Sequence, residues 1–406
     1  MVVWRFGALV LSAAGNIWTA RCLGPGKLGI SGFILTGVGQ ATLLVTLPPS
    51  SYLVRRYKES DSPDGCLKLV ETGTSVRAIF SLIAIVFAAI GILVIPISSD
   101  WQLSVFAGIP LIGVTVLNAA WLLQAQEKQP AQYKSSFFIA LITALVSIAF
   151  IHPGSAAGAD VVVALVAGTA GFLMVWHYAG FHCWWKLFKW SRLIDSSKDI
   201  KAGLWLYLTG VVMYLYVSLE VPLVGYLVSV EDLGLYRTAT VLCAAVNSFL
   251  VMIPTLLFPR FIAWQKESPA KLWILQKRLA VAFTIAGAVV IAGAFVLSPS
   301  VFHWVYGKTF ARAAVPFAML VTSKIIVALN GVFAWGLWSR GRDRAMFSLM
   351  AVTACISVCL NLTLIPRYGM VMAAGVNIAS EVIILIGTLY LSISLNRGVC
   401  EVACGN

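Results

Sequence analysis

The chain consists largely of apolar runs about 20 residues long, separated by short polar segments. A run of about 20 apolar residues can cross the hydrocarbon core of a bilayer as a helix. Backbone groups inside lipid must find partners within their own segment, so such runs fold as helices and not as open strands. Composition agrees, because 60% of the 406 residues are hydrophobic and only 11% are charged. The sequence therefore predicts an all-α polytopic membrane protein.

Twelve spans can be placed along the chain, six in each half. They predict an N-terminal six-helix lobe over residues 1–180, a cytoplasmic amphipathic linker over 181–202 and a C-terminal six-helix lobe over 203–406. In the linker aromatic and cationic residues alternate, which is typical of a helix lying on the inner membrane surface. The predicted spans are 2–20, 29–49, 76–97, 103–125, 135–151, 160–180, 203–229, 234–259, 277–298, 312–339, 345–366 and 370–395.

The cations are distributed unequally between the two sides of this arrangement. With the N-terminus placed in the cytoplasm, 22 of the 29 Lys and Arg residues fall on or near the cytoplasmic side, six on the outer side, and Lys324 alone lies in the middle of a span. Cytoplasmic loops of membrane proteins carry such an excess, so both termini are predicted to be cytoplasmic. The net charge of +13 is then explained by basic loops that face an anionic leaflet, and it requires no nucleic-acid partner.

The two halves of the chain also resemble each other. "LGISGF" begins at Leu28, 27 residues before Arg55, and "LGLYRT" begins at Leu233, 27 residues before Arg260. Both stretches run through the membrane in the same direction. We therefore expect two parallel six-helix repeats, related by an axis along the membrane normal, with a central cavity between the lobes.

Three ionisable residues fall deep inside the C-terminal spans: Glu220, Lys324 and Glu381. At 1.5 Å of rise per residue, each lies roughly 14–18 Å from the outer end of its helix. A charge in lipid costs roughly 3 kcal/mol or more, so the three side chains should face the interior and meet one another. Two interpretations remain open, namely a buried structural ion pair and a site on the transport pathway.

Two arginines are candidates for the outer mouth of the cavity. Arg21 belongs to the turn "ARCLGPGKLG" between the first two spans, where Gly24 and Gly29 permit a tight backbone and Pro25 ends the helix. Arg237 begins the eighth span, on one helical face with Ala244. Guanidinium groups bind phosphate oxygens in pairs, although Arg21 could equally extend to outer headgroups.

Catalytic chemistry has little support in the sequence. The eight cysteines are scattered, and the four histidines are not placed to complete a metal site. No nucleophile–base constellation is visible either. We therefore predict no catalytic residues, no metal and no cofactor.

Four stretches resemble a known family in register: "ARCLGPGKLGISGF" (20–33), "EVPLVGYLVSVEDLGLYRTATVL" (220–242), "WVYGKTFARAAVPFAMLV" (304–321) and "NLTLIPRYGMVMAAGVNIASE" (361–381). Together they resemble the oligosaccharide flippases of the multidrug/oligosaccharidyl-lipid/polysaccharide exporter superfamily, which includes the O-antigen and capsule repeat-unit flippases. One departure is Glu220, where the family often has Asp.

The resemblance implies a function. Such proteins move an oligosaccharide linked to undecaprenyl pyrophosphate from the inner to the outer leaflet of the bacterial inner membrane, by alternating access. The expected partners are this lipid-linked oligosaccharide and membrane lipids, and assembly with a polysaccharide polymerase is left open. Lys324, Arg237, Glu220, Glu381 and Arg21 are the expected substrate-binding residues.

Two other functions compete with this one. A cation-coupled exporter of drugs or small molecules, of the same superfamily, is the main alternative. A polysaccharide polymerase or ligase is less favoured, because the longest outer loop, over residues 299–312, is too short for a catalytic platform.

Overall fold

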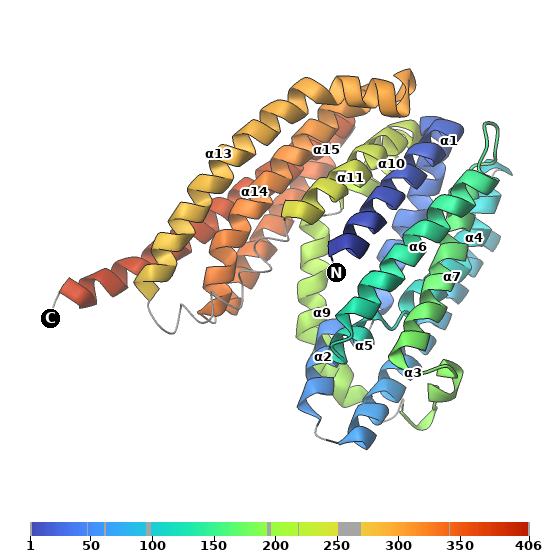
Figure 1. Cartoon of the computed structure of the whole chain (residues 1–406), viewed down its shortest axis with the longest axis horizontal. Coiled ribbons are helices and arrows are strands. Elements are labelled where there is room, and N and C mark those ends of the chain that lie inside the picture. Colours follow the sequence, from blue (N-terminus) through green and yellow to red (C-terminus); the bar gives the residue numbers. More distant parts are fainter. Residues whose placement is uncertain are drawn as a thin grey trace. The chain divides into compact units, whose positions relative to one another are not determined.

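The computed structural model shows a helical protein that divides into two compact units, Met1–Val211 and Val212–Asn406 (Figure 1). Each unit is described separately below. The structure describes residues 2–46, 48–60, 62–94, 99–192, 196–217, 219–250, 269–340 and 342–404.

Unit 1 is a bundle of helices around α1, α4, α6 and α7. The helix α1 packs against α4 and α6, and α7 packs against the same two helices. One apolar core cluster is centred on Trp121 and Trp176, and a second on Val116 and Val161. The elements are α1 (Val2–Val45), α2 (Ser50–Glu59), α3 (Pro63–Val94), α4 (Ser99–Val116), α5 (Ala120–Ala125), α6 (Gln129–Phe150), α7 (Ala159–Ala179), the 3-10 turn η1 (Trp184–Leu187) and α9 (Ser197–Val217), which continues into unit 2.

Unit 2 is organised around α14, which packs against α11, α13 and α15. Figure 1 shows α13, α14 and α15 running beside one another. The elements are α10 (Glu220–Leu227), α11 (Val230–Leu250), α13 (Pro269–Val301), the π-helical turn η2 (Phe302–Tyr306), the 3-10 helix η3 (Lys308–Ala313), α14 (Ala314–Ser339) and α15 (Asp343–Cys404).

Two glycines interrupt the longest helices where the sequence predicts turns between spans. Gly24 breaks α1 with φ 71° and ψ 172°, and Gly369 breaks α15 with φ 69° and ψ −155°. A positive φ is accessible to glycine without steric cost, and Pro25 and Pro366 lie beside the breaks. Each of these long helices therefore contains two of the predicted spans, in the order expected.

The turn around Gly24 is tied to the turn between α6 and α7. Lys27 Nζ donates hydrogen bonds to the carbonyl oxygens of Ser155 at 2.7 Å and Gly154 at 3.4 Å. The backbone N–H of Gly158 donates to Ser31 Oγ at 3.0 Å. These two turns lie at the same end of unit 1, as the alternation of the predicted spans requires.

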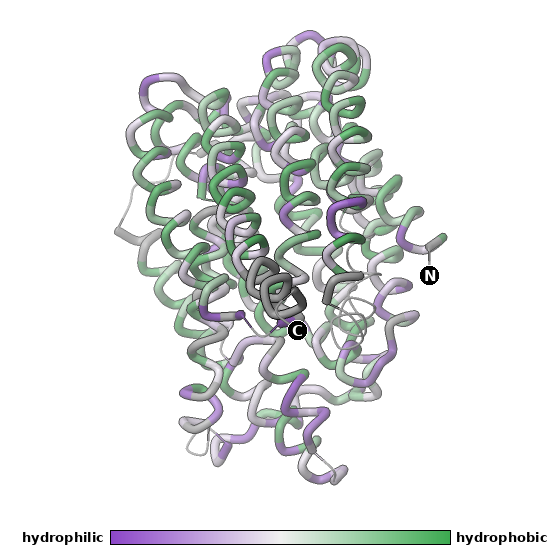
Figure 2. The backbone as a smooth tube through the Cα atoms, turned by 90° about the vertical axis from the view of Figure 1, so that its left-hand side faces the viewer, coloured by the Kyte–Doolittle hydropathy of each residue, from purple (hydrophilic) through white to green (hydrophobic). Residues whose placement is uncertain are grey.

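The surface of the helices is strongly apolar. Phe87, Phe150, Val296 and Trp304 are each more than 70% exposed, and hydrophobic residues cover most of the helix lengths in Figure 2. Large exposed apolar areas are unusual in soluble monomers and suit a hydrocarbon environment. The predicted fold class, an all-α polytopic membrane protein, is confirmed.

The number of crossings stays a prediction. Within the described residues seven helices are long and apolar enough to cross a membrane, and one bent pair, Tyr207–Leu215 with Glu220–Leu227, would make eight. Two predicted spans share the segment Arg344–Ser394, which contains the break at Gly369. The predicted span 234–259 lies partly outside the described residues. The lobe boundaries also stay predictions.

The predicted linker, residues 181–202, contains the short 3-10 turn η1, and from Ser197 on it forms the first turns of α9. Trp185 and Trp190 are exposed, whereas Leu187 is buried and the Trp184 ring packs against that of Phe172 with centroids 4.9 Å apart. The described part of the linker is thus partly helical and packs on the helices of unit 1 through individual side chains. Its role as an amphipathic element on the membrane surface stays a prediction.

Candidate functional site

A buried polar cluster lies inside unit 2, where α10, α11, α14 and α15 supply the side chains. Glu220 and Glu381 are 4% and 5% exposed. Lys324, on α14, is half-buried. Because isolated charges are very costly in an apolar interior, the partners of these groups define what the cluster can do.

The first carboxylate is that of Glu220, the first residue of α10. It lies just beyond a bend of 48° between the two helical segments that meet there. Asn377 Nδ2 donates a hydrogen bond of 3.1 Å to Glu220 Oε1, and Ser323 Oγ donates to Asn377 Oδ1. A carboxylate at a helix N-terminus is also favoured by the helix dipole.

The second carboxylate is that of Glu381 on α15. Asn330 Nδ2 donates to Glu381 Oε2 at 2.7 Å and to the Glu381 backbone oxygen at 3.1 Å. The spacing of these residues explains why they meet. Asn377 and Glu381 are four residues apart, Ser323 and Asn330 are seven apart, and both spacings place side chains on one helical face.

Lys324 lies in electrostatic range of both carboxylates. Among the described residues no nitrogen–oxygen distance of 4.0 Å or less joins its ammonium to either of them. The amides of Asn330 and Asn377 therefore provide the direct contacts to the carboxylates, and the lysine adds a compensating charge from farther away. A flexible lysine that is not held in a close ion pair can move toward another anion.

The fourth helix, α11, contributes residues that sequence reasoning missed. The Tyr236 side chain is fully buried and interacts electrostatically with Glu220, and its hydroxyl has no hydrogen-bond partner among the described residues. Cys243, seven residues later on the same face, lies in range of Lys324. Ser323 and Asn330 were also missed. Their spacing on a span with Lys324 could have indicated them.

The sequence-predicted site residues are therefore placed as follows. The structure brings Glu220, Lys324 and Glu381 into one cluster. Arg237 is half-buried on α11, directly after Tyr236. Arg21 is exposed on α1 in unit 1, three residues before the break at Gly24.

The cluster is a buried site with charges of both signs. It holds two carboxylates and one lysine within an apolar bundle, in which electrostatic interactions are stronger than in water. Within the described residues there is no group of three or more His, Cys, Asp or Glu side chains that could hold a metal ion. The arrangement can stabilise a further anion through Lys324 and can compensate the lysine when that anion leaves.

Comparison with known proteins identifies the family of the chain. Residues 6–265 match the family model described as polysaccharide biosynthesis protein. The chain belongs to this family. No curated protein sequence matches the chain.

Solved structures share the fold over nearly the whole chain. The lipid II flippase MurJ, in an inward closed conformation, is 14% identical and covers 98% of this chain and 88% of its own, with a TM-score of 0.75. An inward-facing multidrug resistance MATE family transporter of the MOP superfamily is 14% identical, with 97% and 95% coverage and a TM-score of 0.70. An outward-facing MATE transporter gives 14% identity, 97% and 93% coverage and a TM-score of 0.62. The resemblance expected from the motifs is confirmed at the level of family and fold.

Proposed function

We propose that the protein is a flippase for lipid-linked oligosaccharides. It moves a repeat unit carried on undecaprenyl pyrophosphate from the inner to the outer leaflet of a bacterial inner membrane, for polysaccharide or O-antigen synthesis. The observation that carries this proposal is the polysaccharide biosynthesis family match over residues 6–265. The similarity in fold to MurJ, a lipid II flippase, supports it.

The buried cluster of unit 2 supplies a mechanism for the charged part of the cargo. The pyrophosphate must cross a low-dielectric region, where an unpaired anion is very costly. In our proposal Lys324 pairs with the pyrophosphate while cargo is bound and with Glu220 or Glu381 when the site is empty. Arg237 and Arg21 bind phosphate or sugar at the outer mouth. The cycle is alternating access between the two lobes, with no catalysis and no cofactor.

Deleting the gene tests the function directly. We expect lipid-linked oligosaccharide to accumulate in the cytoplasmic leaflet, and an expressed copy of the protein to restore its appearance on the outer face. The measurement is labelling of leaflet-specific sugars in intact cells and in inverted vesicles. Unchanged leaflet distribution, together with lost efflux of a drug or small molecule, would favour the exporter alternative instead.

Membrane topology offers a second test. Because the predicted cation bias places both termini in the cytoplasm, a periplasmically active reporter fused after Asn406 should be silent. The same reporter inserted at Ser155, in the turn bound by Lys27, should be active. Comparable activity at the two positions, or the opposite pattern, would contradict the proposed orientation.

A further inference from the structure

The helix α9 is fixed at its two ends by different parts of the chain. Its last turns pack Val212 and Leu215 against the unit 2 core cluster that includes Leu337 and Met350. Its first turn is bound in unit 1, where Tyr52 donates a hydrogen bond of 2.7 Å to Asp199 Oδ1. Glu220 follows the end of α9 by three residues. The chain therefore runs from the Asp199 contact through α9 to Glu220, the first residue of the buried polar cluster.

Close backbone contact reinforces the docking of the first turns of α9. A Cβ atom added at Gly203 would lie 2.9 Å from Pro49 Cδ and 3.5 Å from Tyr52 Cγ, so only a glycine fits without movement. The turn before α2 is itself held by Arg77, whose Nη2 donates to the Pro48 carbonyl oxygen at 3.0 Å. The surface that receives α9 is thus well defined.

Tyr52 is a stable donor in this contact. Its side chain is 8% exposed. Burial, followed by the hydrogen bond to Asp199, raises the pKa of the Tyr52 phenol to about 12. The hydroxyl therefore stays protonated at physiological pH, and the contact is controlled by geometry and not by titration.

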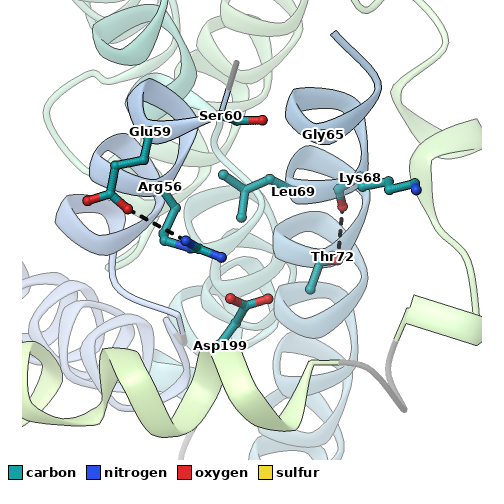
Figure 3. Close-up of a pocket in the computed structure, with 8 residues that line it drawn as sticks. All are labelled: Arg56, Glu59, Ser60, Gly65, Lys68, Leu69, Thr72 and Asp199. Atoms are coloured by element: carbon teal, nitrogen blue, oxygen red, sulfur yellow. Dashed lines mark hydrogen bonds and ion pairs between the residues drawn. The ribbon is translucent and has the colours of Figure 1, made fainter. Parts of the chain in front are cut away.

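Asp199 also borders a pocket that contains other charged side chains. It forms part of the wall of a pocket of about 380 Å³ that is also lined by Arg56, Glu59 and Lys68. Figure 3 shows the Arg56 guanidinium extending between Glu59 and Asp199, and Arg56 Nη1 lies 3.6 Å from Glu59 Oε2. If the hydrogen bond from Tyr52 were broken, the Asp199 carboxylate could be solvated in this pocket and could pair with Arg56.

The strength of the contact suits a reversible role. A hydrogen bond to a charged acceptor biases an equilibrium by about tenfold to a hundredfold. Coupling between sites in allosteric proteins is typically about 5- to 150-fold. One such bond can therefore set the balance between two positions of a helix without locking either.

We propose that Tyr52 and Asp199 are positioning residues for transport, and that their hydrogen bond holds the start of α9 on unit 1 in one state and is released in the other. In the released state Asp199 pairs with Arg56. The inference rests on the proposed flippase function, since it assigns the two states to its alternating access. Neither residue touches the cargo.

The test compares Tyr52→Phe with Tyr57→Phe, a control on the same helix. Tyr52→Phe removes only the donor, so we expect amide hydrogen exchange over residues 197–205 to rise about tenfold. The maximal flipping rate in reconstituted vesicles should change several-fold, while the substrate concentration for half-maximal rate stays constant. Asp199→Asn keeps an acceptor oxygen and should preserve the local protection from exchange. Tyr57→Phe should match the unmodified protein.

Several results would overturn the proposal. Tyr52→Phe could behave as Tyr57→Phe in both measurements, or it could lower the melting temperature and raise exchange throughout unit 1, which would mark the bond as merely structural. Faster local exchange with an unchanged flipping rate would exclude a role in transport. If the unmodified protein moved no lipid-linked oligosaccharide, the proposed function would fail instead, and the exchange data would be unaffected by that failure.

Discussion

Replacing Lys324 by Met should abolish flipping while leaving a folded protein in the membrane. The substitution keeps an unbranched side chain of similar length and removes only the charge. Without the ammonium, the pyrophosphate would cross the buried cluster unpaired, and we expect the flipping rate to fall by about a hundredfold or more. Lys324→Arg should keep partial function, because the charge remains although its shape and hydration differ. The measurement is export per unit of protein detected in the membrane.

The alternative interpretation is that the same cluster is a structural ion pair, and the contacts of the two carboxylates make this testable. Each carboxylate already accepts a direct hydrogen bond from an asparagine. Removing Lys324 would therefore leave two buried carboxylates that are only partly stabilised. If Lys324 were structural, Lys324→Met would remove the protein from the membrane, and adding Glu220→Gln and Glu381→Gln would restore both abundance and export. Normal export by Lys324→Met alone would show that the residue has no role in transport.

Much of the fold could be predicted from the sequence, because it depends on forces that act within single segments. A helix needs about 20 residues to cross the hydrocarbon core of a bilayer, so the length of the apolar runs indicated where the helices lie. The break at Gly24 was predicted because glycine adopts positive φ and Pro25 beside it disfavours helix, and the break at Gly369 falls in the gap expected between the spans 345–366 and 370–395. The gathering of Glu220, Lys324 and Glu381 in one interior region was also predictable, since charges at equal depth in lipid should face the interior. The direct contacts of the two carboxylates are made by asparagines and not by the lysine.

Other features depend on contacts between segments that single-sequence patterns do not show. Asn330 and Tyr236 are ordinary residues of an apolar span, and only packing reveals that one binds Glu381 and the other faces Glu220. Arg77 lies at the cytoplasmic end of the predicted span 76–97, yet it is 3% exposed and donates to the Pro48 carbonyl oxygen. The amphipathic role of the linker stays a prediction, and its composition did not show that it would contact Phe172 and Glu71.

Those partners lead to the last prediction, which concerns the buried carboxylate of Glu71. Glu71 lies on α3 and is 3% exposed. It pairs with Lys189 Nζ and, at 2.9 Å, with Arg192 Nε. Ser75 on the same helix accepts the Lys189 backbone N–H at 2.9 Å. The middle of the linker, at Lys189 and Arg192, is therefore held to α3 by two ion pairs and a hydrogen bond.

The two sides of these ion pairs should respond unequally to substitution. The Lys189 and Arg192 side chains are 47% and 24% exposed, so removing Glu71 leaves cations that can reach water. Removing both cations leaves a buried carboxylate without compensation, which we expect to destabilise unit 1 by about 3 kcal/mol, toward the lower end of the range for broken buried pairs. Lys189→Gln with Arg192→Gln should thus lower the melting temperature of the purified protein clearly, whereas Glu71→Gln should lower it less.

Adding Glu71→Gln to the double variant should restore most of the lost stability, because the stranded charge is then gone. Arg55→Gln is the matched control, since its ion pair with Glu59 joins side chains that are 75% and 44% exposed, and exposed pairs contribute little. Equal losses for the double variant and Glu71→Gln, or no recovery in the triple variant, would contradict the assignment. In that case the linker would be held mainly by the packing of Trp184 and Leu187, and the ion pairs would be a consequence of its position.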